Sequence, residues 1–268
     1  MNTLFRTIIP AASAALLAIA AESCRHTSES SVIDFTTRAD SAAWLLPDYY
    51  GDSAYVAARY SVVWPERIGS RDFDALKDSL TALTFGEYTS ADFDRASERF
   101  LRRTLATLTA DTLERQPASF AEAQEAAVAS MTAVESEVSL LTPDLLVISV
   151  HSWGYMPYDA HGTQSRRFIN YSIRDHSLLT ADKVFTSGSN DAIGKLIEQA
   201  ARGKYTEAAL FADACFTIGD FRFTDSGIEF VYQPYEVGPY SSGIITVELP
   251  AEGLAPYLTP AALSLFGE

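Results

Sequence analysis

The spacing of apolar residues changes partway along this chain, and that change constrains the fold more than any other feature. Between residues 73 and 134, apolar residues recur every three or four positions, as they do on one face of a helix. From residue 138 onward the period is mostly two, which is typical of strands with one buried face. Because helices cluster early and strands late, without βαβ alternation, the sequence predicts an α+β fold with a largely antiparallel sheet packed with helices.

Three helices are expected in the first half. The first covers residues 73–83, and the second covers residues 93–108 with Ser90 available as its N-cap. The third begins at Ser119, which forms a capping box with Glu122. Its apolar stripe is Phe120, Ala123, Ala127, Met131 and Val134.

Strand signals surround and follow these helices. Residues 55–64 indicate one strand or a hairpin stopped by Pro65, and residues 138–150 indicate a hairpin that turns at 142–144. Further strands are expected at 166–173, 216–223, 228–232 and 243–249, with a helix at 191–202 and a short helical tail.

The N-terminus predicts export. Arg6 precedes an uncharged stretch from residue 7 to residue 21, which has the length of a signal-peptide core. The following Ala-Glu-Ser-Cys, which ends at Cys24, resembles the lipobox of bacterial lipoproteins, in which the thiol carries a diacylglycerol. The prediction is lipidation at Cys24 and anchorage in the cell envelope, facing the periplasm or the surface; ordinary secretion is the alternative.

Four segments follow from these patterns. They are a signal peptide (1–23), a flexible tether (24–48), an N-terminal α+β part (49–165) and a C-terminal α+β part (166–268), the last two intimately joined.

Cys215 lies in an apolar run and is expected to be a buried core residue. No later segment has the 18 or so consecutive apolar residues of a membrane-spanning helix.

The net charge of −15 argues against nucleic acid or an anionic membrane surface as a partner, because both repel an acidic protein. The charge is compatible with a basic partner, but on its own it indicates solubility in a crowded envelope first.

No motif predicts catalysis, a metal or a cofactor. His151, His161 and His176 are too far apart in sequence for a zinc site built from close ligand pairs. Asp159 and His161 could share one face of a strand as an acid–base pair, but between glycines they are more typical of a hydrogen-bonded turn.

Two aromatic loops, residues 153–162 and 232–243, are the best candidates for a binding surface. Both combine Tyr with Pro and Gly, so rigid rings can project from a stiff backbone. The alternative is that these tyrosines pack between sheet and helices. The candidate binding residues are Tyr155, Tyr158, Asp159, Tyr235, Glu236 and Tyr240.

The same loops carry a family resemblance. Residues 158–162, 178–185, 221–230 and the Pro-Tyr-Glu-Val-Gly-Pro-Tyr stretch at 234–240 resemble the extracytoplasmic domain family of the lysozyme-sensing anti-sigma factor RsiV and the accessory domains of the peptidoglycan deacetylase PdaC. Stand-alone lipoproteins of unknown function in the Bacteroidetes group are similar. The resemblance covers roughly residues 55–250, and residues 49–165 are the PdaC-like part.

The resemblance implies a non-catalytic binding module without a cofactor, whose partner is a lysozyme-like basic protein or peptidoglycan. This chain has neither the sigma-binding domain nor the deacetylase domain of those relatives, so those activities do not carry over. Two alternatives stay open: an enzyme that modifies cell-wall glycan with Asp159 or Glu236 as acid or base, and a structural or assembly lipoprotein.

Overall fold

The computed structural model describes most of the chain after its N-terminal segment. The described ranges are 33–49, 52–68, 73–86, 92–108, 116–125, 128–155 and 160–266. They all belong to one compact unit, Ser31–Glu268. The predicted signal peptide and Cys24, the predicted cap Ser90, and the candidates Tyr158 and Asp159 lie outside these ranges.

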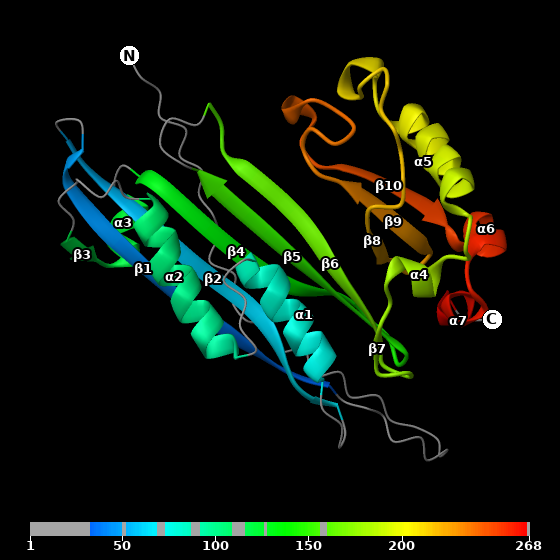
Figure 1. Cartoon of the computed structure of the whole chain (residues 1–268), viewed down its shortest axis with the longest axis horizontal. Coiled ribbons are helices and arrows are strands. Elements are labelled where there is room, and N and C mark those ends of the chain that lie inside the picture. Colours follow the sequence, from blue (N-terminus) through cyan, green and yellow to red (C-terminus); the bar gives the residue numbers. More distant parts are fainter. Residues whose placement is uncertain are drawn as a thin grey trace. The chain divides into compact units, whose positions relative to one another are not determined.

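Seven strands form one large sheet (Figure 1) in the order β3-β1-β2-β4-β5-β6-β7. Among the described residues, β2 and β4 pair in parallel, and the other neighbouring strands pair antiparallel. The strands are β1 (Ile33–Tyr49), β2 (Asp52–Ile68), β3 (Gln116–Ala118), β4 (Val128–Leu141), β5 (Leu145–Tyr155), β6 (Thr163–Ser172) and β7 (Ser177–Leu178).

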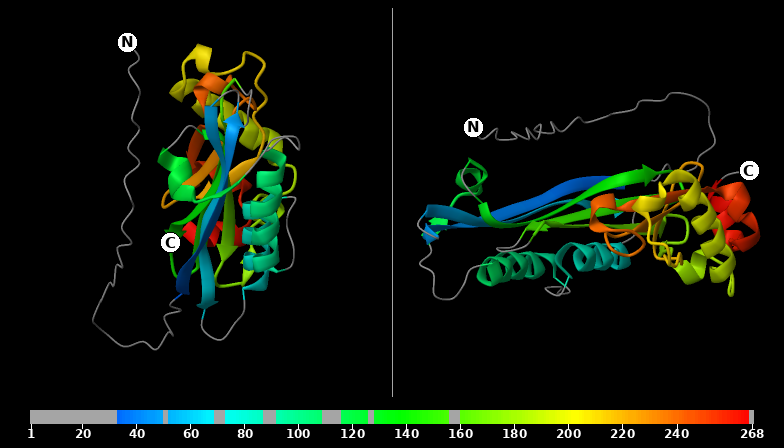
Figure 2. Two further views of the ribbon diagram at one scale, coloured as in Figure 1. Left: turned by 90° about the vertical axis from the view of Figure 1, so that its left-hand side faces the viewer. Right: turned by 90° about the horizontal axis from the view of Figure 1, so that it is seen from above.

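Helices cover both faces of this sheet. Helices α1 (Asp74–Phe85) and α2 (Phe93–Leu108) lie along one face, and α3 (Phe120–Glu125) lies on the other (Figure 2). Since successive residues of a strand point to opposite faces, Val56 and Ala58 of β2 belong to the core under α1 and α2, whereas Ala57 packs toward α3.

A second, three-stranded sheet has the order β10-β9-β8 and is antiparallel throughout. It comprises β8 (Asp220–Phe223), β9 (Gly227–Tyr232) and β10 (Ile245–Pro250), and it is accompanied by α4 (Ala181–Val184), α5 (Asn190–Lys204), α6 (Ala251–Leu254) and α7 (Pro260–Leu263). The apolar face of α5, with Ile193 and Ile197, packs into a core with alternate residues of all three strands.

Strand β5 joins the two cores. Leu146 and Ile148 belong to the core under α1 and α2, whereas their neighbours Leu145 and Val147 belong to the core around α5. All four are buried, which explains why this strand is continuously apolar. The predicted α+β class with two joined parts is confirmed, but the expected boundary between residues 165 and 166 falls inside β6.

The buried amide of Asn170 on β6 connects the two sheets. Its Nδ2 donates to the carbonyl of Phe221 (2.8 Å), and its Oδ1 accepts from the amide N–H of Phe223 (3.1 Å). The side chain therefore satisfies two backbone groups on the edge of β8 that would otherwise be buried without partners.

The structure confirms the helices predicted at 73–83, 93–108 and 191–202 and the hairpin around residues 142–144. Residues 55–64 form one strand, which continues past Pro65. The capping box is also present: the Glu122 carboxylate accepts from both the N–H and the hydroxyl of Ser119, and the Ser119 oxygen accepts from Glu122 N–H.

Two predictions about secondary structure were wrong. The tether does not extend to residue 48, because residues 33–48 lie in β1 and place Leu46 in the core. The third helix ends at Glu125, and Met131 and Val134 lie in β4. Three positions apart on a strand, they face opposite sides: Val134 enters the core under α1 and α2, and Met131 packs beside Ala43 and Ala57.

Two smaller expectations also fail. Only residues 220–223 of the segment expected as a strand at 216–223 form β8. Cys215 is exposed rather than buried, because it lies in the irregular segment before β8, where the neighbouring Phe216 supplies the buried side chain.

Candidate functional site

The second half of the first aromatic loop meets the second aromatic loop at His161. The imidazole stacks on the ring of Tyr240, with centroids 3.5 Å apart and planes 15° from parallel. The ring of Tyr235 lies 6.1 Å from the imidazole and 5.8 Å from Tyr240. Three rings from segments more than 70 residues apart in sequence are thus held together.

Hydrogen bonds fix this arrangement. The Tyr240 hydroxyl donates to the carbonyl of Gly162 (2.6 Å), and His161 Nδ1 lies 3.0 Å from the same oxygen. His161 Nε2 lies 3.0 Å from the hydroxyl of Tyr235. Because a carbonyl can only accept, Nδ1 carries the proton, and in the neutral ring Nε2 accepts from Tyr235.

Both nitrogens of His161 are therefore engaged within the protein. His161 thus contacts both tyrosines, through a hydrogen bond to Tyr235 and through stacking on Tyr240.

Trp153, near the end of β5, extends the aromatic surface. It is 45% exposed. It packs beside Gly162, where an added Cβ would lie 3.3 Å from the indole Nε1 and 3.0 Å from the carbonyl of Gly154. We use the name aromatic cluster for Trp153, His161, Tyr235 and Tyr240.

Tyr235 is the most exposed member, with 59% of its surface accessible. Its φ is +73°, in the left-handed region that residues with a Cβ seldom adopt. The turn that holds it is closed by a hydrogen bond from Tyr235 N to Gly238 O (3.1 Å) and by the Glu236 carboxylate, which accepts from Gln233 N (2.8 Å). Strained backbone of this kind persists only where the surroundings enforce it, and it is frequent at binding sites.

The candidate residues divide into three groups. Tyr235 and Tyr240 come together, Glu236 is used within its own turn, and Tyr155 lies at the end of β5 with its carbonyl bonded to Ser130 Oγ (2.7 Å). Trp153 and His161 belong to the cluster but were not among the predicted site residues. Their place in the same predicted loop was the available signal, whereas the contact between His161 and Tyr240 depends on the tertiary fold.

The remaining histidines have other surroundings. His151 Nε2 accepts from Arg166 Nε (3.0 Å), and burial together with the Arg166 charge lowers the pKa of His151. Among the described residues, no group of three or more His, Cys, Asp or Glu side chains is placed to hold a metal ion. Within the same ranges no helix has the length and apolar character needed to cross a membrane.

Known proteins share this fold. Residues 182–252 match the model of a family described as a protein of unknown function, DUF3298. A crystal structure of a DUF3298 family member from Bacteroides fragilis has a TM-score of 0.69 and 19% identity, and the alignment covers 90% of this chain and 98% of that one. A DUF3298 family protein from Pseudomonas aeruginosa has a TM-score of 0.61 and 17% identity, with 87% and 97% covered. No curated protein matches the chain. The C-terminal part therefore carries a DUF3298 match, and nearly the whole described chain has the architecture of solved DUF3298 proteins.

Proposed function

We propose that this protein is a lipid-anchored, non-catalytic binding protein of the cell envelope, and that the aromatic cluster binds a lysozyme-like basic protein. The observation that carries the proposal is the exposed ring of Tyr235, held in a left-handed backbone conformation beside the stacked pair of His161 and Tyr240. Rings fixed in advance lose little entropy on binding, so they suit a recognition surface.

Charge supports a basic partner. The chain carries a net charge of −15, which would accelerate association with a cationic protein. The resemblance of residues 234–240 to the lysozyme-sensing domain family points to the same class of partner.

The direct test uses the chain from Ser31 onward, which retains the whole compact unit. Its binding to a c-type lysozyme is measured by calorimetry at roughly 0.05 M and 0.5 M salt, because screening weakens attraction between opposite charges. The proposal expects binding that weakens with salt and falls at least about tenfold on Tyr235→Ala.

Leu141→Ala is the matched control. Leu141 is also an exposed apolar residue (48%), but it lies at the opposite end of the β4–β5 hairpin from Trp153. Equal losses from both substitutions, or no binding by the unsubstituted protein, would contradict the lysozyme proposal. Binding to peptidoglycan fragments in place of lysozyme would instead assign the cluster to glycan.

The anchor has a separate test. Incorporation of labelled palmitate in a bacterial expression host should be lost on Cys24→Ala, because the proposed acyl chains are attached through that residue. Labelling that persists in the variant would contradict lipidation at this site.

A further inference from the structure

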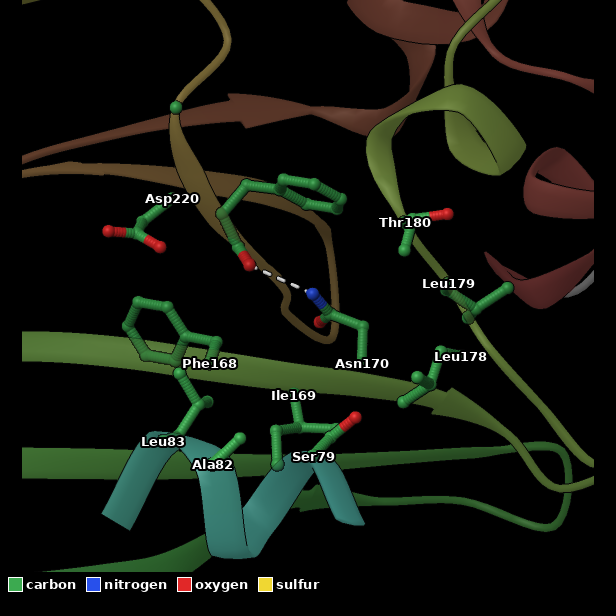
Figure 3. A pocket seen from close by; sticks show the side chains of 12 residues that line it. Ser79, Ala82, Leu83, Phe168, Ile169, Asn170, Leu178, Leu179, Thr180 and Asp220 are labelled. Atoms are coloured by element: carbon green, nitrogen blue, oxygen red, sulfur yellow. Dashed lines mark hydrogen bonds between the residues drawn. The ribbon is translucent and has the colours of Figure 1, made fainter. Parts of the chain in front are cut away.

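A groove lies away from the aromatic cluster, along the outer edge of β6 (Figure 3). Its volume is about 320 Å³, within the range of small ligand pockets. One wall is α1, with Ser79, Ala82 and Leu83, and the other is the start of β8, with Asp220 and Phe221. Leu178, Leu179 and Thr180 lie at one end.

The floor of the groove is a strand edge. Strand β7 pairs with β6 only at Tyr171 and Ser172. Beyond that point the chain turns away, after one more hydrogen bond from Leu179 N to Asn170 O (2.8 Å). The groove is the space that β7 would fill if it continued along β6.

Farther along the same edge, a side chain takes the place of a strand. Gln233 Nε2 donates to the carbonyl of Arg166 (2.8 Å), and Gln233 Oε1 accepts from Arg166 N–H (3.0 Å). One amide side chain thus makes both hydrogen bonds that a paired strand residue would make.

Phe168 lies between these two satisfied positions. The peptide groups of Arg166 and Asn170 point outward, away from β5, so by the alternation of an antiparallel pair those of Phe168 also point outward. No residue in the described ranges hydrogen-bonds them. An edge with a free N–H and C=O is a template for another strand.

We propose that this groove binds an extended peptide, which adds a short strand to the edge of β6 through two main-chain hydrogen bonds to Phe168. The apolar walls, Ala82 and Leu83 among them, receive the side chains of the peptide. Gln233 and Leu179 close the two ends of the edge, so the added strand is short.

The charge of the groove selects a peptide with a basic residue. Asp220 uses one carboxylate oxygen, Oδ2, for both Gln233 Nε2 (3.1 Å) and Arg167 Nη1 (3.5 Å). Its Oδ1 has no partner in the part of the chain that the structure describes, and it is available to a lysine or arginine of the peptide. The net charge of −15 favours the same sign of ligand.

The probe is an acetylated and amidated pentapeptide of alternating valine and threonine with a central lysine, titrated against the protein and followed by amide chemical shifts. Two main-chain hydrogen bonds and one ion pair predict weak binding, with a Kd on the order of 0.1–1 mM. N-methylation of the central peptide groups should weaken binding at least about tenfold, because it removes the strand hydrogen bonds. A central glutamate should weaken it similarly.

A blocking variant localises the binding. Ala82 is exposed on α1 and lines the groove, so Ala82→Phe fills the groove without disturbing the core. Ala75→Phe makes the same change at an exposed position of α1 outside the groove. The first variant should lose binding at least about tenfold, and the second should bind like the unsubstituted protein.

Several outcomes would overturn the proposal. They are no binding at about 5 mM peptide, equal binding of the N-methylated probe, and equal effects of the two phenylalanine variants. Tyr235→Ala should leave peptide binding unchanged, which separates this groove from the aromatic cluster. Failure of lysozyme binding and failure of peptide binding are therefore independent results.

Discussion

At the scale of single residues, Tyr235 combines an exposed ring with a backbone conformation that lowers stability. Its φ of +73° suits glycine, yet a tyrosine occupies the position and its ring reaches His161. A left-handed conformation costs a residue with a Cβ on the order of 1–2 kcal/mol. The hydrogen bonds of the turn, from Tyr235 N to Gly238 O and from Gln233 N to the Glu236 carboxylate, hold this conformation.

The strain at Tyr235 predicts an unusual order of stabilities. Tyr235→Ala and Tyr235→Gly remove the same ring contacts, but only glycine relieves the strain at φ +73°. We expect the glycine variant to be about 1 kcal/mol more stable than the alanine variant in urea unfolding. If the proposed function holds, both variants should lose lysozyme binding to the same extent. An alanine variant as stable as the glycine variant would show that the backbone at this position is relaxed.

At the scale of elements, side chains close strand edges in three places within the described ranges. Gln233 bonds the edge of β6 at Arg166, Asn170 bonds the edge of β8, and the Tyr205 hydroxyl bonds both Thr246 N and Thr246 O on β10. Free strand edges promote association with other chains, and each of these side chains satisfies two backbone groups at once. Within the described ranges, the edge of β6 is left open at Phe168, between Arg166, which Gln233 bonds, and Asn170, whose carbonyl accepts from the main-chain N–H of Leu179.

His151, which lies on β5 where it pairs with β6, makes the stability of the protein depend on pH. Burial and the charge of Arg166 lower the pKa of His151, so folding disfavours its protonated form. Its contribution to stability is present above the unfolded pKa of about 6.5 and is lost as the pH falls from there through the folded value.

His151→Gln tests this dependence. When the pH is lowered from about 7.5 to about 5, the urea concentration at the midpoint of unfolding should decrease in both proteins, because carboxylates also titrate. The decrease should be smaller in the glutamine variant. Glutamine does not take up a proton in this range and can still accept from Arg166 Nε. Equal falls in the two proteins would assign the whole acid sensitivity to carboxylates.

Elements with a strong local signal could be predicted from the sequence, and elements fixed by distant partners could not. The stripe of α2 has the right period over the whole helix, and the prediction matches its bounds. The third predicted helix failed because Val134 and Met131 keep helical spacing while serving two different cores on opposite faces of β4. Strand β1 was missed because most of its side chains are exposed or half-buried: among those described, only Ala43 and Leu46 are buried, which leaves a polar composition typical of a tether.

The candidate site shows the same division. Aromatic loops were identifiable because Tyr, Pro and Gly are local signals, and Tyr235 and Tyr240 do lie in one cluster. The stacking of His161 on Tyr240 joins residues that are 79 positions apart in the sequence, so no local pattern predicts it. The groove on β6 depends on where β7 stops and where Gln233 arrives, so it too required the tertiary structure.

At the scale of the whole molecule, β5 makes the two cores interdependent. Its buried residues alternate between the core under α1 and α2 and the core around α5. Asn170 adds a polar connection between the sheets. Loss of either core would expose one full face of β5, so the compact unit should unfold in a single transition.

The distribution of tryptophan allows that cooperativity to be measured. All three, Trp44, Trp64 and Trp153, lie in the large sheet, whereas Ile197 lies in α5 within the other core. Ile197 is fully buried, so Ile197→Ala should destabilise the protein by about 2–5 kcal/mol. If the two cores unfold together, tryptophan fluorescence and circular dichroism should report the same lowered urea midpoint. If the fluorescence midpoint stays unchanged while the circular dichroism midpoint falls, the part around α5 unfolds independently. Strand β5 would then contribute residues to both cores without coupling their unfolding.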